Sequence, residues 1–208
     1  MEEIIKDYYD NGNIKEERYY QDGVFHRDGK PAIICYYENG SVNIEEYYVN
    51  GKKHRKNGPS CIKYYENGNV THEIYCVRGK IHRKNEPAWI GYWEDGTIRY
   101  MEYYRNNKVH RENGPAVFNY YKNGTIKNQA YCVKGKRHKD NEAAWIGYHP
   151  NGKVEFKAYF INGKRSRLDG PAYIKYNTRG KIEIQTYWID DIEYEDVFKY
   201  SVEVGSIK

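Results

Sequence analysis

Histidines recur along the chain at a constant spacing, which is the first feature to test for metal chemistry. Five histidines lie 28 residues apart and a serine takes the sixth position: His26, His54, His82, His110, His138 and Ser166. Imidazole nitrogens that share one zinc ion each lie about 2.0–2.1 Å from the metal. If each 28-residue unit adds two antiparallel strands spaced about 4.8 Å apart, equivalent histidines lie roughly 10 Å apart. We therefore predict that each histidine hydrogen-bonds within its own connecting segment and that the row holds no metal.

The other residues with catalytic potential form no recognisable motif. The chain has no glycine-rich phosphate loop, no His-Glu-x-x-His and no Cys-x-x-Cys. Acidic residues are scattered through turns and polar positions, and His72 and His149, which lie outside the regular row, have no evident nucleophile beside them. The sequence therefore predicts a protein that is not an enzyme and that uses no cofactor.

Basic side chains gather in the segments that carry the histidines. The set predicted to contact a polyanion is Lys52, Lys53, Arg55, Arg83, Arg111, Lys136, Arg137, Arg165 and Arg167. The formal net charge of +5 therefore conceals a basic stripe, which suits an acidic protein or an anionic membrane surface. Nucleic acid is not favoured, because the aromatic residues lie inside strand-like runs and no known binding motif is present. Alternatively, these charges only keep a long sheet soluble and deter lateral association.

Large side chains replace the usual residues at a few strand positions, and these are the candidate residues for binding a protein partner. They are Trp89, Trp93, Trp145, His149 and Tyr173. The segment from Cys76 to Tyr92 recurs 56 residues later as Cys132 to Tyr148. Duplication of a two-unit block explains this recurrence; the functional alternative is that matched tryptophans open matched pockets. Exposed Tyr and Trp rings would also suit a glycan, which is a weaker alternative.

The elements that position these residues follow from the repeat itself. Prolines occupy one lattice with a 28-residue period: Pro31, Pro59, Pro87, Pro115 and Pro171, with Ala143 in the gap. Tyrosines occupy two others, which contain Tyr36 and Tyr47. A period in this range indicates one supersecondary unit copied end to end, each copy covering its neighbour. With 25 tyrosines in a chain that is 39% hydrophobic, we expect a thin structure stabilised by amphipathic rings.

One repeat predicts one β-hairpin followed by a polar connector. In the unit 31–58, Asn39-Gly40 separates two strand-like runs, and Asn-Gly favours a type I′ turn. The fold class predicted is all-β: an elongated, twisted antiparallel meander of about seven hairpin repeats, with a short C-terminal helical cap. A parallel solenoid, with one coil per 28 residues, is the alternative architecture.

The ends of the chain give the domain prediction. Residues 1–191 are assigned to the repeat array, and residues 192–208 to a cap with a short helix from about Tyr194 to Ser201, because a terminal sheet edge needs cover. The four cysteines are expected to be free thiols. With no signal sequence or membrane-spanning run, the chain is expected to be cytoplasmic.

The repeat pattern resembles the MORN-variant hairpin repeat. Its elements are Tyr-Tyr-x-Asn-Gly followed by Tyr-x-x-Asn-Gly-Lys-x-His-Arg-x-x-Gly-Pro-Ala, clearest in residues 36–88 and 103–121, and the similarity covers about residues 8–190. Such connectors are familiar from large DNA viruses, phages and bacteria, where some relatives are labelled antitoxin components. Ordinary MORN repeats are shorter and centre on different Gly and Trp positions. The resemblance implies stacked hairpins and a non-enzymatic scaffold that mediates protein–protein interaction, sometimes attached to a membrane surface.

Overall fold

The protein is built almost wholly of antiparallel β-hairpins. The computed structural model describes residues 1–195, 201 and 203–205. It divides into two compact units, Met1–Lys108 and Val109–Lys208. The sheet strands of the first unit are β1 (Glu2–Tyr8), β2 (Ile14–Gln21), β4 (Ile33–Tyr36), β5 (Val42–Glu46), β8 (Cys61–Tyr64), β9 (Val70–Ile74), β12 (Trp89–Tyr92) and β13 (Ile98–Glu102). Those of the second unit are β16 (Val117–Tyr120), β17 (Ile126–Ala130), β20 (Trp145–Tyr148), β21 (Val154–Ala158), β24 (Tyr173–Tyr176), β25 (Ile182–Ile189) and β26 (Ile192–Tyr194).

Short strands of two residues lie between the sheet hairpins. They are β3 (Val24–Phe25), β6 (Tyr48–Val49), β7 (Lys52–Lys53), β10 (Cys76–Val77), β11 (Lys80–Ile81), β14 (Tyr104–Arg105), β15 (Lys108–Val109), β18 (Cys132–Val133), β19 (Lys136–Arg137), β22 (Phe160–Ile161) and β23 (Lys164–Arg165).

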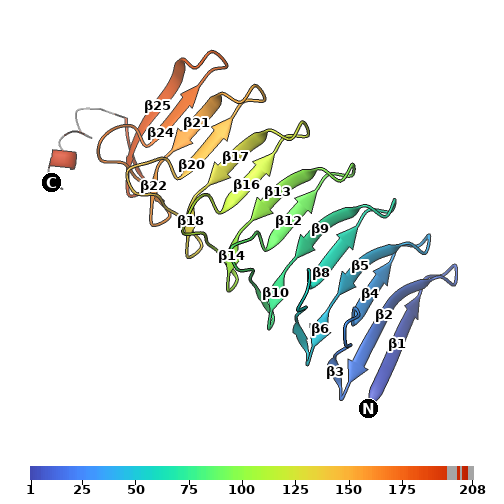
Figure 1. Ribbon diagram of the computed structural model, residues 1–208. Helices are drawn as coiled ribbons and strands as arrows, with labels where there is room; N and C mark the ends of the chain where they lie inside the picture. Colours follow the sequence, from blue (N-terminus) through green and yellow to red (C-terminus); the bar gives the residue numbers. More distant parts are fainter. Residues whose placement is uncertain (196–200, 202, 206–208) are drawn as a thin grey trace. The chain divides into compact units, whose positions relative to one another are not determined.

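Within each unit the strands pair in the order of the chain. The first unit has the order β1-β2-β4-β5-β8-β9-β12-β13, with β3 on β2, and the second has β16-β17-β20-β21-β24-β25-β26 (Figure 1). Each hairpin is joined to the next by an antiparallel pair, such as Glu45 opposite Ile62 between β5 and β8. The predicted antiparallel meander is therefore confirmed, and the parallel solenoid is excluded.

The sheet turns differ from the type I′ turn that Asn39-Gly40 predicts. Only Gly40 is left-handed, with φ of 86°. Its amide donates to the carbonyl of Tyr37 at 2.9 Å, and the amide of Ser41 donates to Asn39 Oδ1 at 2.9 Å. These bonds define a type I turn closed by a left-handed glycine, which is accompanied by a register shift beside Tyr36. The prediction was wrong because the Asn side chain stabilises the turn by bonding two residues ahead.

Type I′ turns do occur, but inside the segments predicted to be plain polar connectors. Asn50 and Gly51 both have positive φ, 48° and 73°, and they join β6 to β7. Each connector is thus a second, shorter hairpin. The amide of Gly51 also donates to the carbonyl of Phe25 at 2.9 Å, so the short hairpins of successive repeats are linked as well as the long ones.

The core is thin and depends on small residues. The position after each residue of the proline lattice is fully buried: Ala32, Ser60, Ala88, Ala116, Ala144 and Ala172 are all 0% exposed. The amide of Ala32 donates to the carbonyl of Glu46 at 2.8 Å, and its carbonyl accepts from Tyr19 at 2.8 Å.

The C-terminal helix starts beyond Tyr194, the first residue of its predicted span. Tyr194 is not the start of a helix; it lies in β26, opposite Tyr187 of β25. The helical residues that the structure describes are Ser201 and 203–205, while the predicted helical positions 196–200, Val197 and Phe198 among them, lie outside the described residues. Val204 packs against Ile189, and both are buried, so the described helical residues contact the end of β25. Among the described residues, no helix is long and apolar enough to cross a bilayer.

Candidate functional site

The arginine of the His-Arg-x-x-Gly-Pro motif organises its own repeat. The guanidinium carbon of Arg55 lies 3.8 Å from the centroid of the Tyr47 ring, and Nη1 donates to the carbonyl of Pro59 at 3.4 Å. Stacking recurs in the pairs Arg27–Tyr19, Arg83–Tyr75 and Arg167–Tyr159. Bonds to proline carbonyls recur at Arg27, Arg83, Arg111 and Arg167. Four of the nine basic candidates (Arg55, Arg83, Arg111 and Arg167) are therefore engaged in framework contacts.

Two loop geometries alternate after this arginine. In one, the third residue after the arginine is a glycine with large positive φ, such as Gly58 at 127°. In the other, the second residue is left-handed, such as Asn85 at 63°. The first kind occurs at Gly58, Gly114 and Gly170, and the second at Gly29, Asn85 and, where Lys139 takes the place of the arginine, Asn141. The 56-residue regularity of the sequence is thus a structural alternation as well.

Three histidines of the row bond to the following repeat through Nδ1, while their Nε2 atoms lie near an acidic residue of their own connector, as predicted. His26 Nδ1 accepts from the amide of Asn50 at 3.1 Å, and its Nε2 lies 3.2 Å from Asp28. His110 and His138 accept in the same way from Lys134 and Asn162. Among the described residues, no group of three potential ligands is placed to hold a metal ion.

Carboxylates line one side of the first unit and are bound by tyrosines. Glu17 accepts hydrogen bonds from Tyr19 and Tyr36, each at 3.1 Å, and pairs with Lys6 at 2.7 Å. Burial, with the bond to Glu17, raises the pKa of Tyr36 to about 12. Glu45 and Glu73 repeat the arrangement with Tyr64 and Tyr92. The corresponding positions of the second unit are Gln129, Lys157 and Gln185, so this carboxylate row belongs to the first unit.

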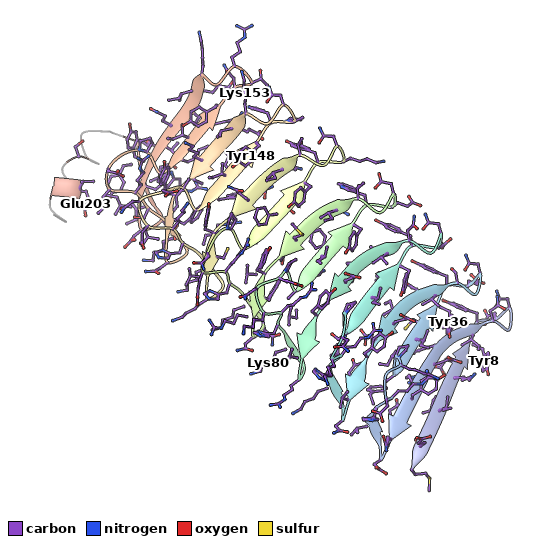
Figure 2. The ribbon with its side chains drawn as sticks, in the orientation of Figure 1. Tyr8, Tyr36, Lys80, Tyr148, Lys153 and Glu203 are labelled. Atoms are coloured by element: carbon purple, nitrogen blue, oxygen red, sulfur yellow. The ribbon has the colours of Figure 1, made fainter. Side chains whose placement is uncertain are left out.

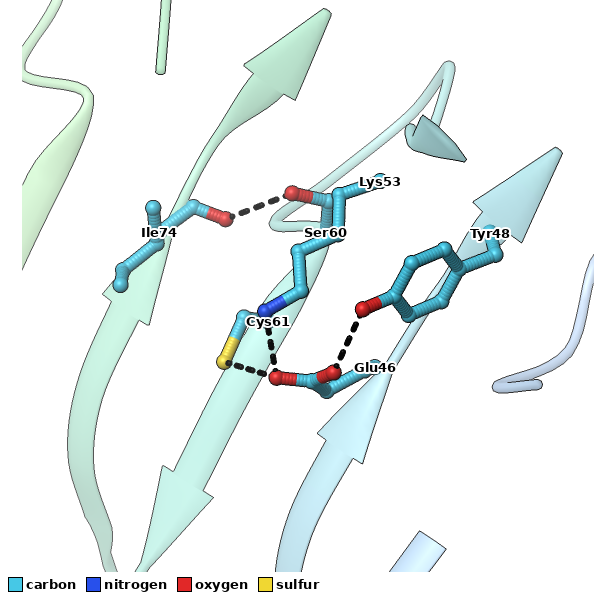
Figure 3. A network of polar contacts seen from close by, with 6 residues as sticks. All are labelled: Glu46, Tyr48, Lys53, Ser60, Cys61 and Ile74. Atoms are coloured by element: carbon cyan, nitrogen blue, oxygen red, sulfur yellow. Dashed lines mark hydrogen bonds and ion pairs between the residues drawn. The ribbon is translucent and has the colours of Figure 1, made fainter. Parts of the chain in front are cut away.

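A second polar network surrounds Glu46 (Figure 3). It accepts from Lys53 Nζ at 2.5 Å and from the Tyr48 hydroxyl at 3.0 Å, and Cys61 Sγ lies 3.8 Å away. Burial, helped by the charge of Glu46, raises the pKa of Cys61 to about 11. The thiol is therefore protonated at neutral pH, and Lys53, a candidate for polyanion binding, already has an acidic partner. The network can stabilise the fold but lacks a nucleophile.

Matched tryptophans lie beside matched glycines in the two units. In β12, a Cβ on Gly91 would lie 2.1 Å from the Tyr100 ring, and that ring meets Trp89 edge-on with centroids 6.1 Å apart. In β20, Gly147 lies under Phe156 in the same way, and Phe156 meets Trp145 at 4.8 Å. The glycine makes room for an aromatic ring from the neighbouring strand. Sequence reasoning missed this pairing. Its signal in the sequence is the recurring Trp-Ile-Gly-Tyr with an aromatic residue, Tyr100 or Phe156, in the next strand.

A groove of about 710 Å³ opens beside Trp145 in the second unit. Its lining includes Lys136, Arg137 and Trp145, three of the sequence candidates, with Asn119, Asn128 and Lys164. The Arg137 guanidinium carbon lies 4.3 Å from the centroid of the Trp145 ring. Asn119 Nδ2 donates to Asn128 Oδ1 at 2.8 Å. The two asparagines were missed by sequence reasoning, because they belong to the freely varying strand positions.

The remaining aromatic candidates lie elsewhere. Trp93 directly follows β12, with the Arg99 guanidinium carbon 4.7 Å from the centroid of its ring. His149 takes the repeat position of Tyr37, whose hydroxyl donates to the carbonyl of Tyr64 in the next repeat. In the same way, His149 Nε2 lies 3.0 Å from the carbonyl oxygen of Tyr176.

Tyr173 and the last basic candidates complete the set. Tyr173 lies in β24 and stacks on Phe156 with centroids 6.0 Å apart. Arg165 lies near several rings, with its guanidinium carbon 4.9 Å from Trp188 and 5.5 Å from Tyr173. Lys52 is exposed on its short hairpin, and Figure 2 shows the equivalent Lys80 on the hairpin of β10 and β11. The structure thus brings Lys136, Arg137 and Trp145 together on one groove, places Tyr173 and Arg165 nearby around Phe156 and Phe160, and leaves the other candidates dispersed.

These features define a class of protein, a tandem array of β-hairpin repeats with a connector architecture that recurs along the chain. Three segments match the family model of the MORN repeat variant: residues 4–22, 32–50 and 141–162. The resemblance to the MORN-variant repeat is thereby confirmed. No curated protein matches the chain. One similar solved structure, titled "Crystal Structure of TcdB2-TccC3-TEV", has 12% identity and a TM-score of 0.18, and the match covers 96% of this chain and 14% of that one.

Proposed function

We propose that the chain is a non-enzymatic binding protein whose repeat framework presents tryptophan-containing surfaces to a protein partner. The observation that carries this proposal is the position of Trp89 and Trp145. Each is the first residue of its sheet strand, is only half-buried, and contacts other aromatic rings of its own unit. Tryptophan and arginine are the residues that most often dominate binding energy at protein interfaces.

The framework leaves these positions free to vary. Arg55 and Ala32 represent rows that stack on rings or fill the core, and their residue types change little along the chain. The strand positions around Trp145 vary from repeat to repeat. A constant scaffold with a variable strand surface is the arrangement by which repeat proteins recognise partners.

Affinity capture from the native cell, followed by mass spectrometry, tests the proposal. Trp89→Ala and Trp145→Ala are expected to lose partners that the unaltered protein retains. His149→Tyr is the matched control, because it restores the residue most common in its row and keeps a donor for the Tyr176 carbonyl. Equal recovery of the same partners by both tryptophan variants would refute the assignment of these surfaces.

Binding to an anionic membrane surface or another polyanion through the basic connectors is the alternative. It is supported by exposed basic residues on the short hairpins, such as Lys52 and Lys136. Sedimentation with anionic vesicles at low ionic strength, weakening steeply as salt is added, is the expected behaviour. An absence of vesicle binding at low salt removes this alternative.

A further inference from the structure

The groove beside Trp145 is lined by two kinds of element, the sheet strands and the short hairpins. Asn119, Asn128 and Trp145 come from the sheet strands β16, β17 and β20, whereas Lys136 and Lys164 come from the short hairpins. Its volume of about 710 Å³ falls within the range of about 300–1,000 Å³ that is usual for ligand sites. A short stretch of extended peptide is therefore a suitable occupant in size.

The charges on the groove are all of one sign. Its lining residues include Lys136, Arg137 and Lys164 and no acidic side chain. Lys164 is 3.7 Å from Asp190 in an exposed pair, which is a weak interaction. Lys136 and Arg137 have no acidic partner among the residues that the structure describes. The groove thus presents cationic groups that suit a negatively charged ligand.

Arg137 is held in place by aromatic rings. Its guanidinium carbon lies 4.3 Å from the Trp145 ring centroid and 5.5 Å from that of Phe160. Stacking of this kind leaves the edge of the guanidinium plane open for a carboxylate, which it binds through two parallel hydrogen bonds. Because Asn119 Nδ2 donates to Asn128 Oδ1, the Nδ2 group of Asn128 can donate a hydrogen bond to a peptide carbonyl.

The first unit offers an internal comparison. At the positions 56 residues earlier, Lys80 corresponds to Lys136, but Ile81 corresponds to Arg137 and Ile74 to Ala130. The smaller Ala130 is 4% exposed and lines the groove. The second unit therefore combines extra space with an added cation at one place, which duplication of a structural block alone does not explain.

We propose that this groove binds an acidic peptide segment, rich in Glu or Asp, of the partner protein. The inference rests on the proposed function and specifies the chemistry of the partner. Arg137 binds a carboxylate, Lys136 and Lys164 attract neighbouring ones, and Trp145 packs against the aliphatic part of the segment.

Fluorescence anisotropy of a labelled short polyglutamate peptide, with polyglutamine of the same length as control, tests the proposal on the full chain. Polyglutamate is expected to bind and polyglutamine is not. Arg137→Ile introduces the residue that the first unit holds at the equivalent position, so folding is expected to be retained. Loss of one charged hydrogen-bonding group is expected to weaken binding about tenfold to hundredfold.

The matched pair Lys136→Ala and Lys80→Ala locates the site. Lys136→Ala is expected to weaken binding severalfold, whereas Lys80→Ala leaves it unchanged. Equal effects of the two variants, or binding that is unaffected by Arg137→Ile, would show general attraction to the basic stripe and overturn the proposal. Binding to anionic vesicles but not to polyglutamate would overturn it too.

The capture experiment separates the two ideas. If Trp145→Ala loses native partners while polyglutamate fails to bind, the acidic-segment inference fails and the proposed function stands. If polyglutamate binds through Arg137 but capture is unaffected by both tryptophan variants, the groove is a site and the proposed tryptophan surfaces are refuted.

Discussion

Replacing Gly91 by alanine is the sharpest test of how the aromatic surface of the first unit is built. The alanine Cβ would lie 2.1 Å from Cε1, 2.3 Å from Cζ and 2.7 Å from Cδ1 of Tyr100. Ordinary contacts of a Cβ begin near 3.4 Å, so the ring has to move by more than an ångström. Because Gly91 is buried in β12 between two paired strands, the backbone has little freedom to move instead.

The cost follows from this overlap. Forcing one extra methyl group into a packed position typically destabilises a protein by about 1–3 kcal/mol. Moving the Tyr100 ring also disturbs its edge-on contact with Trp89, at 6.1 Å between centroids, and such contacts contribute about 0.5–1.5 kcal/mol. We expect Gly91→Ala to lower the free energy of unfolding by about 2 kcal/mol.

Urea unfolding followed by tryptophan fluorescence measures this change. Adding Tyr100→Ala should remove the overlap, so that the two substitutions together cost less than their sum by at least about 1 kcal/mol. Gly205→Ala is the control, because a Cβ there meets open space. If Gly91→Ala leaves the free energy of unfolding unchanged, or if the effects of Gly91→Ala and Tyr100→Ala simply add, the glycine is not needed to make room for the Tyr100 ring.

Three further predictions concern the framework. Gly58→Ala places a side chain at φ of 127°, 3.3 Å from the Arg55 guanidinium, and should cost about 1–2 kcal/mol in urea unfolding; an unchanged midpoint would contradict the strain. The second prediction concerns Glu17. Burial alone would raise the pKa of this carboxyl group, but hydrogen bonds from Lys6 and the tyrosines outweigh the effect of burial, so the pKa of Glu17 is lowered from 4.5. Its stabilisation is present above that pH and is lost as pH falls through the folded-state pKa, and Glu17→Gln should flatten this acid dependence of unfolding. Burial and the charge of Glu46 raise the pKa of Cys61 to about 11, so a thiol reagent at neutral pH should modify Cys61 far more slowly in the folded than in the unfolded chain; equal rates would refute its burial.

The architecture was accessible from the sequence because its signals are local and repeated. The alternation of Ile34 and Tyr36 and the recurring Asn-Gly pairs predict paired strands without knowledge of the tertiary structure. The turn type was assigned to the wrong loop, because Asn-Gly is compatible with both turns and the deciding bond, from the Ser41 amide to Asn39 Oδ1, is a three-dimensional detail. Strands of two residues, such as β6, are too short for periodicity to reveal.

The candidate site was predictable only in part. The sequence named Trp145 as a candidate for partner binding and Lys136 and Arg137 as candidates for polyanion binding, but it gave no reason to group them with Asn119 and Asn128. Their proximity depends on how the short hairpins lie against the sheet strands. The histidine partners were missed for a related reason, since they are backbone amides of the next repeat whose distance depends on the pitch of the stack.

The alternation of the two connector loops has a consequence for engineering the chain. Removing 28 residues would place two loops of the same geometry next to each other, for example those of Gly58 and Gly114. Removing 56 residues preserves the sequence of loop types. Shortened or lengthened versions should therefore be made in steps of two repeats, with the pair of repeats as the natural module of the array.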